Sequence, residues 1–71
     1  MDRIHVRSSN LRSVGYDPET ETLEVEFLDG GIHQYFGVPE SRHEGLMGAY
    51  SKGRYFNTFI KKGLYRNRRI R

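Results

Sequence analysis

Apolar and acidic residues alternate across residues 22–28, where Glu24 and Glu26 separate three apolar side chains. An alternation with a period of two predicts a β-strand that buries one face and turns its glutamates toward water. The Asp-Gly-Gly stretch at residues 29–31 tolerates positive φ angles and leads into a β-prone run at residues 32–36. Two strands joined in this way form a hairpin, so the sequence predicts an antiparallel sheet.

Two registers of this hairpin are compatible with the sequence. A two-residue turn would place Ile32 and Phe36 on the face of the sheet that carries Val25. A three-residue loop with a bulge would place His33 and Tyr35 on that face instead, because a slip by one residue exchanges the two faces. The alternation alone therefore leaves open whether Tyr35 or Phe36 belongs to the core.

One further strand is expected before the hairpin. Residues 11–16 alternate weakly between apolar and polar side chains, and Asp17-Pro18 after them is typical of a turn. Residues 1–8 are expected to form either a flexible arm or an edge strand.

Two short helices are expected after the hairpin. Pro39 suits the first turn of a helix over residues 39–49, and Ser51 suits the N-cap of a helix over residues 52–62. Gly63 is the expected C-cap of the second helix. We therefore predict an α+β domain over residues 9–63, in which two short helices pack on one face of a three-stranded antiparallel meander. Residues 64–71 are expected to form a basic tail.

Each predicted helix has an apolar face. The first helix is expected to turn four side chains inward: His43, Leu46, Met47 and Tyr50. The second helix is expected to have one broad apolar face, formed by Tyr55, Phe56, Phe59 and Ile60. Its polar side chains are expected on the opposite face: Arg54, Thr58 and Lys61. Gly45 and Gly48 each weaken the first helix by about 1 kcal/mol relative to alanine, and both could allow it to approach the sheet closely.

The length and composition limit the class of protein. A chain of 71 residues has room for one domain with a small core. It contains no cysteine, which excludes disulfides and thiolate metal sites. No apolar run approaches the roughly 20 residues of a membrane-spanning helix, and the first ten residues lack the apolar centre of a secretory signal. We expect a cytoplasmic protein that does not contact membranes.

Charge is distributed very unevenly along the chain. All nine acidic residues lie in residues 1–45, together with four arginines, whereas residues 46–71 contain eight basic residues and no acidic one. Such an asymmetry indicates an anionic partner, and the chemistry of lysine and arginine suits the phosphates of a nucleic acid. We expect binding of RNA or another single strand, through the second helix and the basic tail.

The candidate nucleic-acid-binding residues are of two kinds. The first are cations that could neutralise phosphates: Lys52, Arg54, Lys61, Lys62, Arg66, Arg68 and Arg69. The second are tyrosines whose rings could stack on bases: Tyr35 and Tyr55. Of Tyr35 and Phe36, the residue on the outer face of the sheet is the better stacking candidate. Phe27, Phe56 and Phe59 are expected in the core, since a domain of this size needs aromatic volume inside.

Other kinds of chemistry have little support in the sequence. His5, His33 and His43 are far apart and show no ligand spacing, so no metal site is predicted. No group of residues meets the requirements of a catalytic site, so we expect a protein that is not an enzyme and that uses no cofactor. The alternative is a protein-interaction module, such as a phage-type inhibitor, that uses the sheet face or edge; Glu24 and Glu26 would give it an acidic face. The sequence leaves the oligomeric state open.

Several ordered stretches resemble the KTSC domain family. They are Ser9-Asn10, Val14-Gly15-Tyr16-Asp17, the strand around Val25, Gly30-Gly31, Tyr35-Phe-Gly-Val-Pro39 and Ser51-Lys-Gly-Arg-Tyr-Phe-Asn57. The family is named after the C-terminal extension of some lysyl-tRNA synthetases and also occurs as small bacterial and phage proteins of unestablished function. Its Tyr-x-Tyr motif has His33 in place of the first tyrosine here. The resemblance implies the register with His33 and Tyr35 beside Val25, and it implies RNA binding by analogy with the synthetases.

Overall fold

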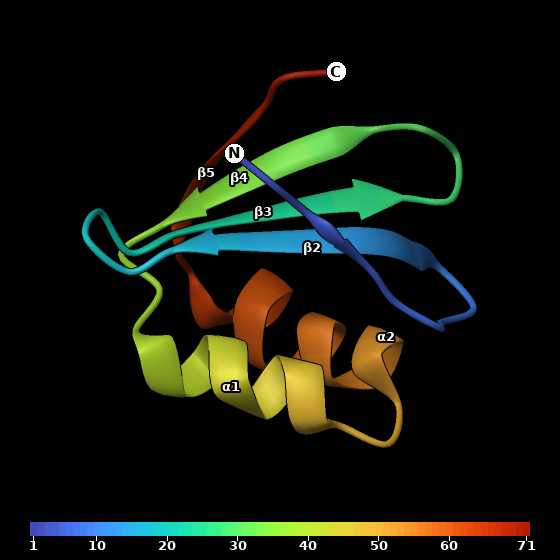
Figure 1. The fold of residues 1–71 in the computed structure, drawn as a ribbon. Coiled ribbons are helices and arrows are strands. Elements are labelled where there is room, and N and C mark those ends of the chain that lie inside the picture. Colours follow the sequence, from blue (N-terminus) through green and yellow to red (C-terminus); the bar gives the residue numbers. More distant parts are fainter.

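A five-stranded antiparallel sheet forms one layer of the protein (Figure 1). The computed structural model describes all residues, 1–71. Each strand pairs with its neighbours in chain order, so the sheet is a meander whose last strand follows the helices. The strands are β1 (Ile4–His5), β2 (Leu11–Asp17), β3 (Thr22–Phe27), β4 (Ile32–Phe36) and β5 (Arg66–Arg69).

The hairpin between β3 and β4 takes the register with the three-residue loop. Val25 lies opposite His33, and Leu23 lies opposite Tyr35. The loop is closed by the amide of Phe27, which donates to the carbonyl of Gly31 at 2.8 Å. Gly30 adopts a φ of 94°, a conformation that glycine reaches without strain. His33 and Tyr35 therefore share the face of Val25, as the family resemblance implied.

The helical layer covers one face of the sheet (Figure 1). It begins with α1 (Glu40–Gly48) and continues after a short link with α2 (Lys52–Tyr55). The second helix then changes its winding, first to a π-helical segment, η1 (Phe56–Ile60), and then to a 3-10 turn, η2 (Lys61–Gly63). The hydroxyl of Ser51 accepts from the amide of Arg54 at 3.3 Å, which confirms the predicted N-cap.

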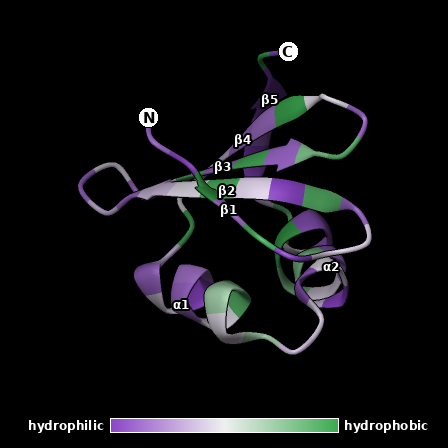
Figure 2. Cartoon of the chain, turned by 45° about the vertical axis from the view of Figure 1, so that its right-hand side comes forward, coloured by the Kyte–Doolittle hydropathy of each residue, from purple (hydrophilic) through white to green (hydrophobic).

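The core lies between the two layers. Its nine buried side chains come from three strands, the link before α1 and both helices: Leu11, Val14, Leu23, Val25, Tyr35, Val38, Leu46, Phe56 and Ile60. Tyr35 and Phe27 each meet the ring of Phe56 edge-on, with 5.4 Å between ring centroids. Hydropathy alternates along β3, as Figure 2 shows, because only one side of the strand faces the helices.

The α+β class is confirmed, but the sheet has five strands where three were predicted. β1 forms the short edge strand that was one of two expectations for residues 1–8. β5 is made of residues expected as a basic tail; all four of its residues are exposed, and it is hydrophilic throughout (Figure 2). No apolar alternation marks it in the sequence, because it is held by backbone pairing with β4. Leu64, and not Gly63, adopts the left-handed conformation after the helix, with a φ of 63°.

Some predicted helix faces are wrong. Tyr50 is fully exposed because α1 ends before it, at Gly48. Phe59 is 39% exposed and lies under the guanidinium of Arg42, 4.6 Å from its ring centroid. Neither glycine of α1 brings that helix close to the sheet: Gly45 faces the ring of Tyr55 on the second helix, and Gly48 faces open space. None of the helices has the length and apolar character needed to cross a bilayer.

Candidate functional site

The cations that follow Glu44 are almost all unpaired. Of these eight residues only Arg71 contacts an acidic side chain, that of Glu26 at 3.3 Å. Arg69 donates to the main-chain oxygen of Arg71 at 3.0 Å. The remaining ion pairs join Arg3 or Arg12 to Glu24 or Glu26, and all of these residues lie in the N-terminal half. Seven predicted phosphate-binding residues thus have no acidic side chain as a partner: Lys52, Arg54, Lys61, Lys62, Arg66, Arg68 and Arg69.

The cations of the second helix differ in how freely they reach solvent. Arg54, Lys61 and Lys62 are exposed. Lys52 is half-buried, and its ammonium donates to the carbonyl of Ala49 at 3.3 Å, which holds the side chain against the link between the helices. Lys61 and Lys62 lie in the last turn, where cations interact favourably with the carbonyl end of a helix.

The cations of β5 lie on two faces of the sheet. Arg66 lies opposite Phe36 and Arg68 opposite Gln34, whereas Arg69 lies opposite His33. Because side chains alternate along a strand, Arg66 and Arg68 belong to the open face and Arg69 to the face that carries the helices. β5 is also the last strand of the sheet. Its arginines therefore line a free edge, with cations on both sides of it.

The two predicted stacking tyrosines are not freely exposed rings. Tyr35 is only 6% exposed because it packs into the core against Phe56, and this burial raises the pKa of its hydroxyl. Tyr55 is half-buried, 4.6 Å from the ring of Phe59. The aromatic side chain on the outer face is Phe36, which is half-exposed. The sequence analysis favoured the residue on the outer face for stacking, so Phe36 is the better stacking candidate of β4.

A hollow between β4 and the second helix brings together residues that the sequence analysis did not group. It has a volume of about 300 Å³ and is lined by Asn10, Phe27, His33, Tyr35, Phe56, Asn57 and Lys61. A second hollow of about 260 Å³ adjoins it and shares Asn10 and Phe27. The lining residues come mostly from the stretches that resemble the KTSC family, and this could have indicated that they lie together. Among the predicted phosphate-binding residues, Lys61 lines this hollow with His33, and Arg69 is the strand partner of His33 on β5.

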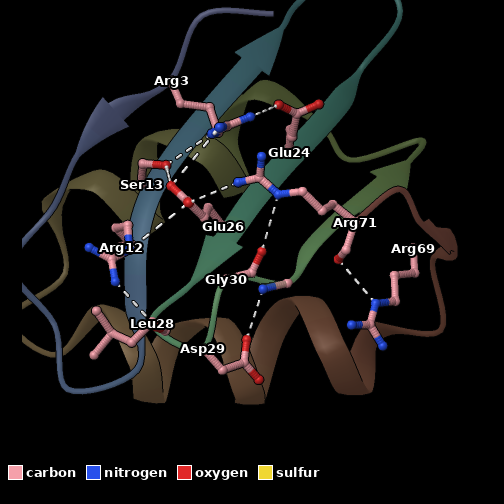
Figure 3. Close-up of polar contacts among 11 residues, drawn as sticks. Arg3, Arg12, Ser13, Glu24, Glu26, Leu28, Asp29, Gly30, Arg69 and Arg71 are labelled. Carbon is pink, nitrogen blue, oxygen red and sulfur yellow. Dashed lines mark hydrogen bonds and ion pairs between the residues drawn. The ribbon is translucent and has the colours of Figure 1, made fainter.

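The open face of the sheet carries a network of charged groups in place of the predicted water-facing acids (Figure 3). Glu24 is only 4% exposed, because Arg3 pairs with it and the amide of Gln34 donates to it at 2.9 Å. Glu26 accepts from the hydroxyl of Ser13 at 2.8 Å.

Several cations converge on Glu26. Arg3, Arg12 and Arg71 all lie within ion-pairing distance of its carboxylate. The hydrogen bond from Ser13 and these cations lower the pKa of Glu26. The acidic face on which the protein-interaction alternative rested is therefore neutralised within the molecule.

Comparison with known proteins agrees with the resemblance seen in the sequence. The family model described as "KTSC domain" matches residues 7–65. An uncharacterized protein of Stutzerimonas stutzeri is 47% identical over 99% of both chains. A lysine–tRNA ligase of Nostoc sp. is 47% identical over 75% of this chain, which corresponds to only 9% of the ligase. The crystal structure of a KTSC domain protein from Yersinia pestis superposes with a TM-score of 0.92, at 46% identity and over 99% of this chain and 97% of the other. On this sequence and structural similarity, the chain belongs to the KTSC domain family.

Proposed function

We propose that the protein is a non-catalytic module that binds single-stranded nucleic acid, with RNA as its natural ligand. The observation that carries the proposal is the set of seven cations that pair with no acidic side chain, in a stretch of chain without any acidic residue. A cation that is already paired gives up that interaction when it binds phosphate, whereas an unpaired cation gives up only water and counterions. Release of counterions from the nucleic acid then drives binding.

The arrangement of these cations favours a flexible strand over a rigid duplex. Arginines line both sides of the free edge at β5, and Lys61 lies beside the same region on the helical side. A single strand can contact cations on both sides of an edge because its backbone bends freely. Arginine also offers bidentate hydrogen bonds to phosphate oxygens. The choice of RNA is supported by the matching segment in a lysine–tRNA ligase, an enzyme whose name states that it acts on a tRNA.

Binding of a short oligouridylate at several salt concentrations tests the proposal. Affinity should fall as salt rises, with a slope of about −0.7 for each phosphate neutralised on a single strand. Charge reversal by Lys61→Glu or Arg69→Glu should weaken binding. It should also make the salt slope shallower by about 0.7, the contribution of one phosphate.

The matched control is Arg7→Glu, which changes the net charge equally at an exposed residue of the N-terminal segment. This variant should bind nearly as well as the natural protein. The absence of binding at low salt would refute the proposal. Equal weakening by Arg7→Glu and Lys61→Glu would show that net charge alone, and not this surface, attracts the strand.

A further inference from the structure

The larger hollow has the composition of a binding site for a planar, polar ring. Phe27 and Phe56 form apolar walls, and the rings of His33 and Tyr35 lie side by side, inclined by only 21° to one another with 6.4 Å between centroids. Ligand pockets typically combine such apolar and aromatic walls with a few polar groups, in volumes of about 300–1,000 Å³. The hollow lies at the lower end of this range, which suits one ring and not a larger ligand.

Four polar side chains of the hollow have no hydrogen-bond partner inside the protein. The side chains of His33, Asn57 and Lys61 and the hydroxyl of Tyr35 take part in none of the side-chain hydrogen bonds. None of them is sealed away from solvent either, because the structure contains no buried polar side-chain atom without a partner. These groups are therefore accessible and available to a ligand.

One further polar group is held in a fixed orientation. The carbonyl oxygen of the Asn10 side chain accepts from the hydroxyl of Ser8 at 3.1 Å, which leaves its NH₂ group as the free donor. Gly53 makes this placement possible, since a Cβ there would collide with the side chain of Asn10. Asn10 and Lys61 together make the hollow rich in donors, a property that suits the carbonyl oxygens of a base.

The hollow also lies beside the proposed track of the nucleic-acid backbone. Lys61 forms part of its wall, and Arg69 lies directly across from His33 on β5. Side chains of directly opposed residues on one sheet face lie about 5 Å apart at Cβ. A base placed in the hollow would thus have its own phosphate near Lys61, which has no partner, with Arg69 on the neighbouring strand.

We propose that this hollow receives one unpaired base of the bound strand, with His33 and the aromatic walls against the ring and Asn10 and Asn57 at its polar edge. The inference rests on the proposed function and makes it more specific. The cations hold the backbone of any single strand, whereas the hollow adds affinity only when a base is present.

The test compares an oligouridylate with an abasic ribose-phosphate oligomer of equal length. Uridine suits the test because its ring offers two carbonyl oxygens to the donors. The natural protein should bind the oligouridylate on the order of tenfold more tightly, which is within the range that one stacked base contributes. Asn57→Ala and His33→Ala should reduce this ratio toward one while leaving the affinity for the abasic oligomer unchanged.

Thr58→Ala is the matched control, because Thr58 is an exposed neighbour of Asn57 that does not line the hollow. It should keep both affinities. Equal binding of the two oligomers by the natural protein would overturn the base site while leaving the proposed function intact, as would a ratio that Asn57→Ala and His33→Ala do not change. A failure of both oligomers to bind at low salt would overturn the two proposals together.

Discussion

Two glycines of α1 provide a sharp test of how the helices pack. A Cβ at Gly45 would lie 2.6 Å from Cζ and 3.0 Å from Cε2 of Tyr55, whereas a Cβ at Gly48 would meet nothing within 4 Å. Alanine in place of glycine stabilises a helix interior by about 1 kcal/mol, and less at a helix end. Gly45→Ala gains this contribution but also forces the ring of Tyr55 aside, and such overpacking costs about 1–3 kcal/mol.

The two substitutions should therefore have opposite signs. We expect Gly45→Ala to lower the free energy of unfolding by about 1 kcal/mol, and Gly48→Ala, at the last residue of α1, to raise it by about 0.5 kcal/mol. The difference of about 1.5 kcal/mol corresponds to a difference in Tm of about 6–12 °C for a domain of this size. Thermal and urea denaturation followed by circular dichroism measure both quantities.

A double-mutant cycle identifies the cause. In a Tyr55→Ala background the ring is gone, so Gly45→Ala should become stabilising, as it is for any unobstructed helix residue. If Gly45→Ala stabilises the natural protein as much as Gly48→Ala does, then Tyr55 does not pack on Gly45, and the described contact between the two helices is refuted.

Two further predictions concern ionisable groups. His43 stacks on Tyr16, and burial lowers the pKa of its imidazole below 6.5. The stability that neutral His43 contributes is therefore complete above pH 6.5. It is lost as the pH falls from 6.5 through the pKa of His43 in the folded protein. An NMR titration should give a pKa below 6.5, and a value above 6.5 would contradict this. Arg3→Ala should lower the free energy of unfolding by about 1–3 kcal/mol, because it leaves the buried carboxylate of Glu24 with Gln34 as its remaining partner. The exposed Arg7, changed to alanine, is the control for urea denaturation, and equal effects of the two substitutions would contradict the ion pair.

The elements that the sequence predicted well are those whose apolar side chains recur at a regular spacing or whose end residues have a local role. The hairpin of β3 and β4 was visible because apolar and acidic side chains alternate along β3. The N-cap at Ser51 was visible because its chemistry is local. β5 was missed for the opposite reason. Its side chains are all polar and exposed, and its place in the sheet depends on backbone pairing with β4, which leaves no trace in side-chain hydropathy.

The candidate site also contains residues that the sequence could indicate and residues that only the fold brings together. Counting charges selected the cations, but it did not show which of them are unpaired, because Arg71 reaches Glu26 from a distant part of the chain. Glu24 looked like a water-facing acid because its partner, Arg3, is 21 residues away in sequence. The hollow could not be derived from spacing, because Asn10, His33 and Asn57 come from three distant segments that only the folded chain brings together.

The pairing of both chain ends with Glu26 has a practical consequence. Arg3 and Arg71 reach the same carboxylate, at 4.0 and 3.3 Å, so the N- and C-termini emerge together over the sheet surface that the helices leave uncovered (Figure 1). A fusion partner at either end would project away from the helical layer and its hollow. Neighbouring termini also make a domain suitable for insertion into a larger polypeptide or for circular permutation through a short linker. This scaffold can therefore be attached by either end, or by both, without covering the hollow, although Arg66 and Arg68 share the open face with the two termini.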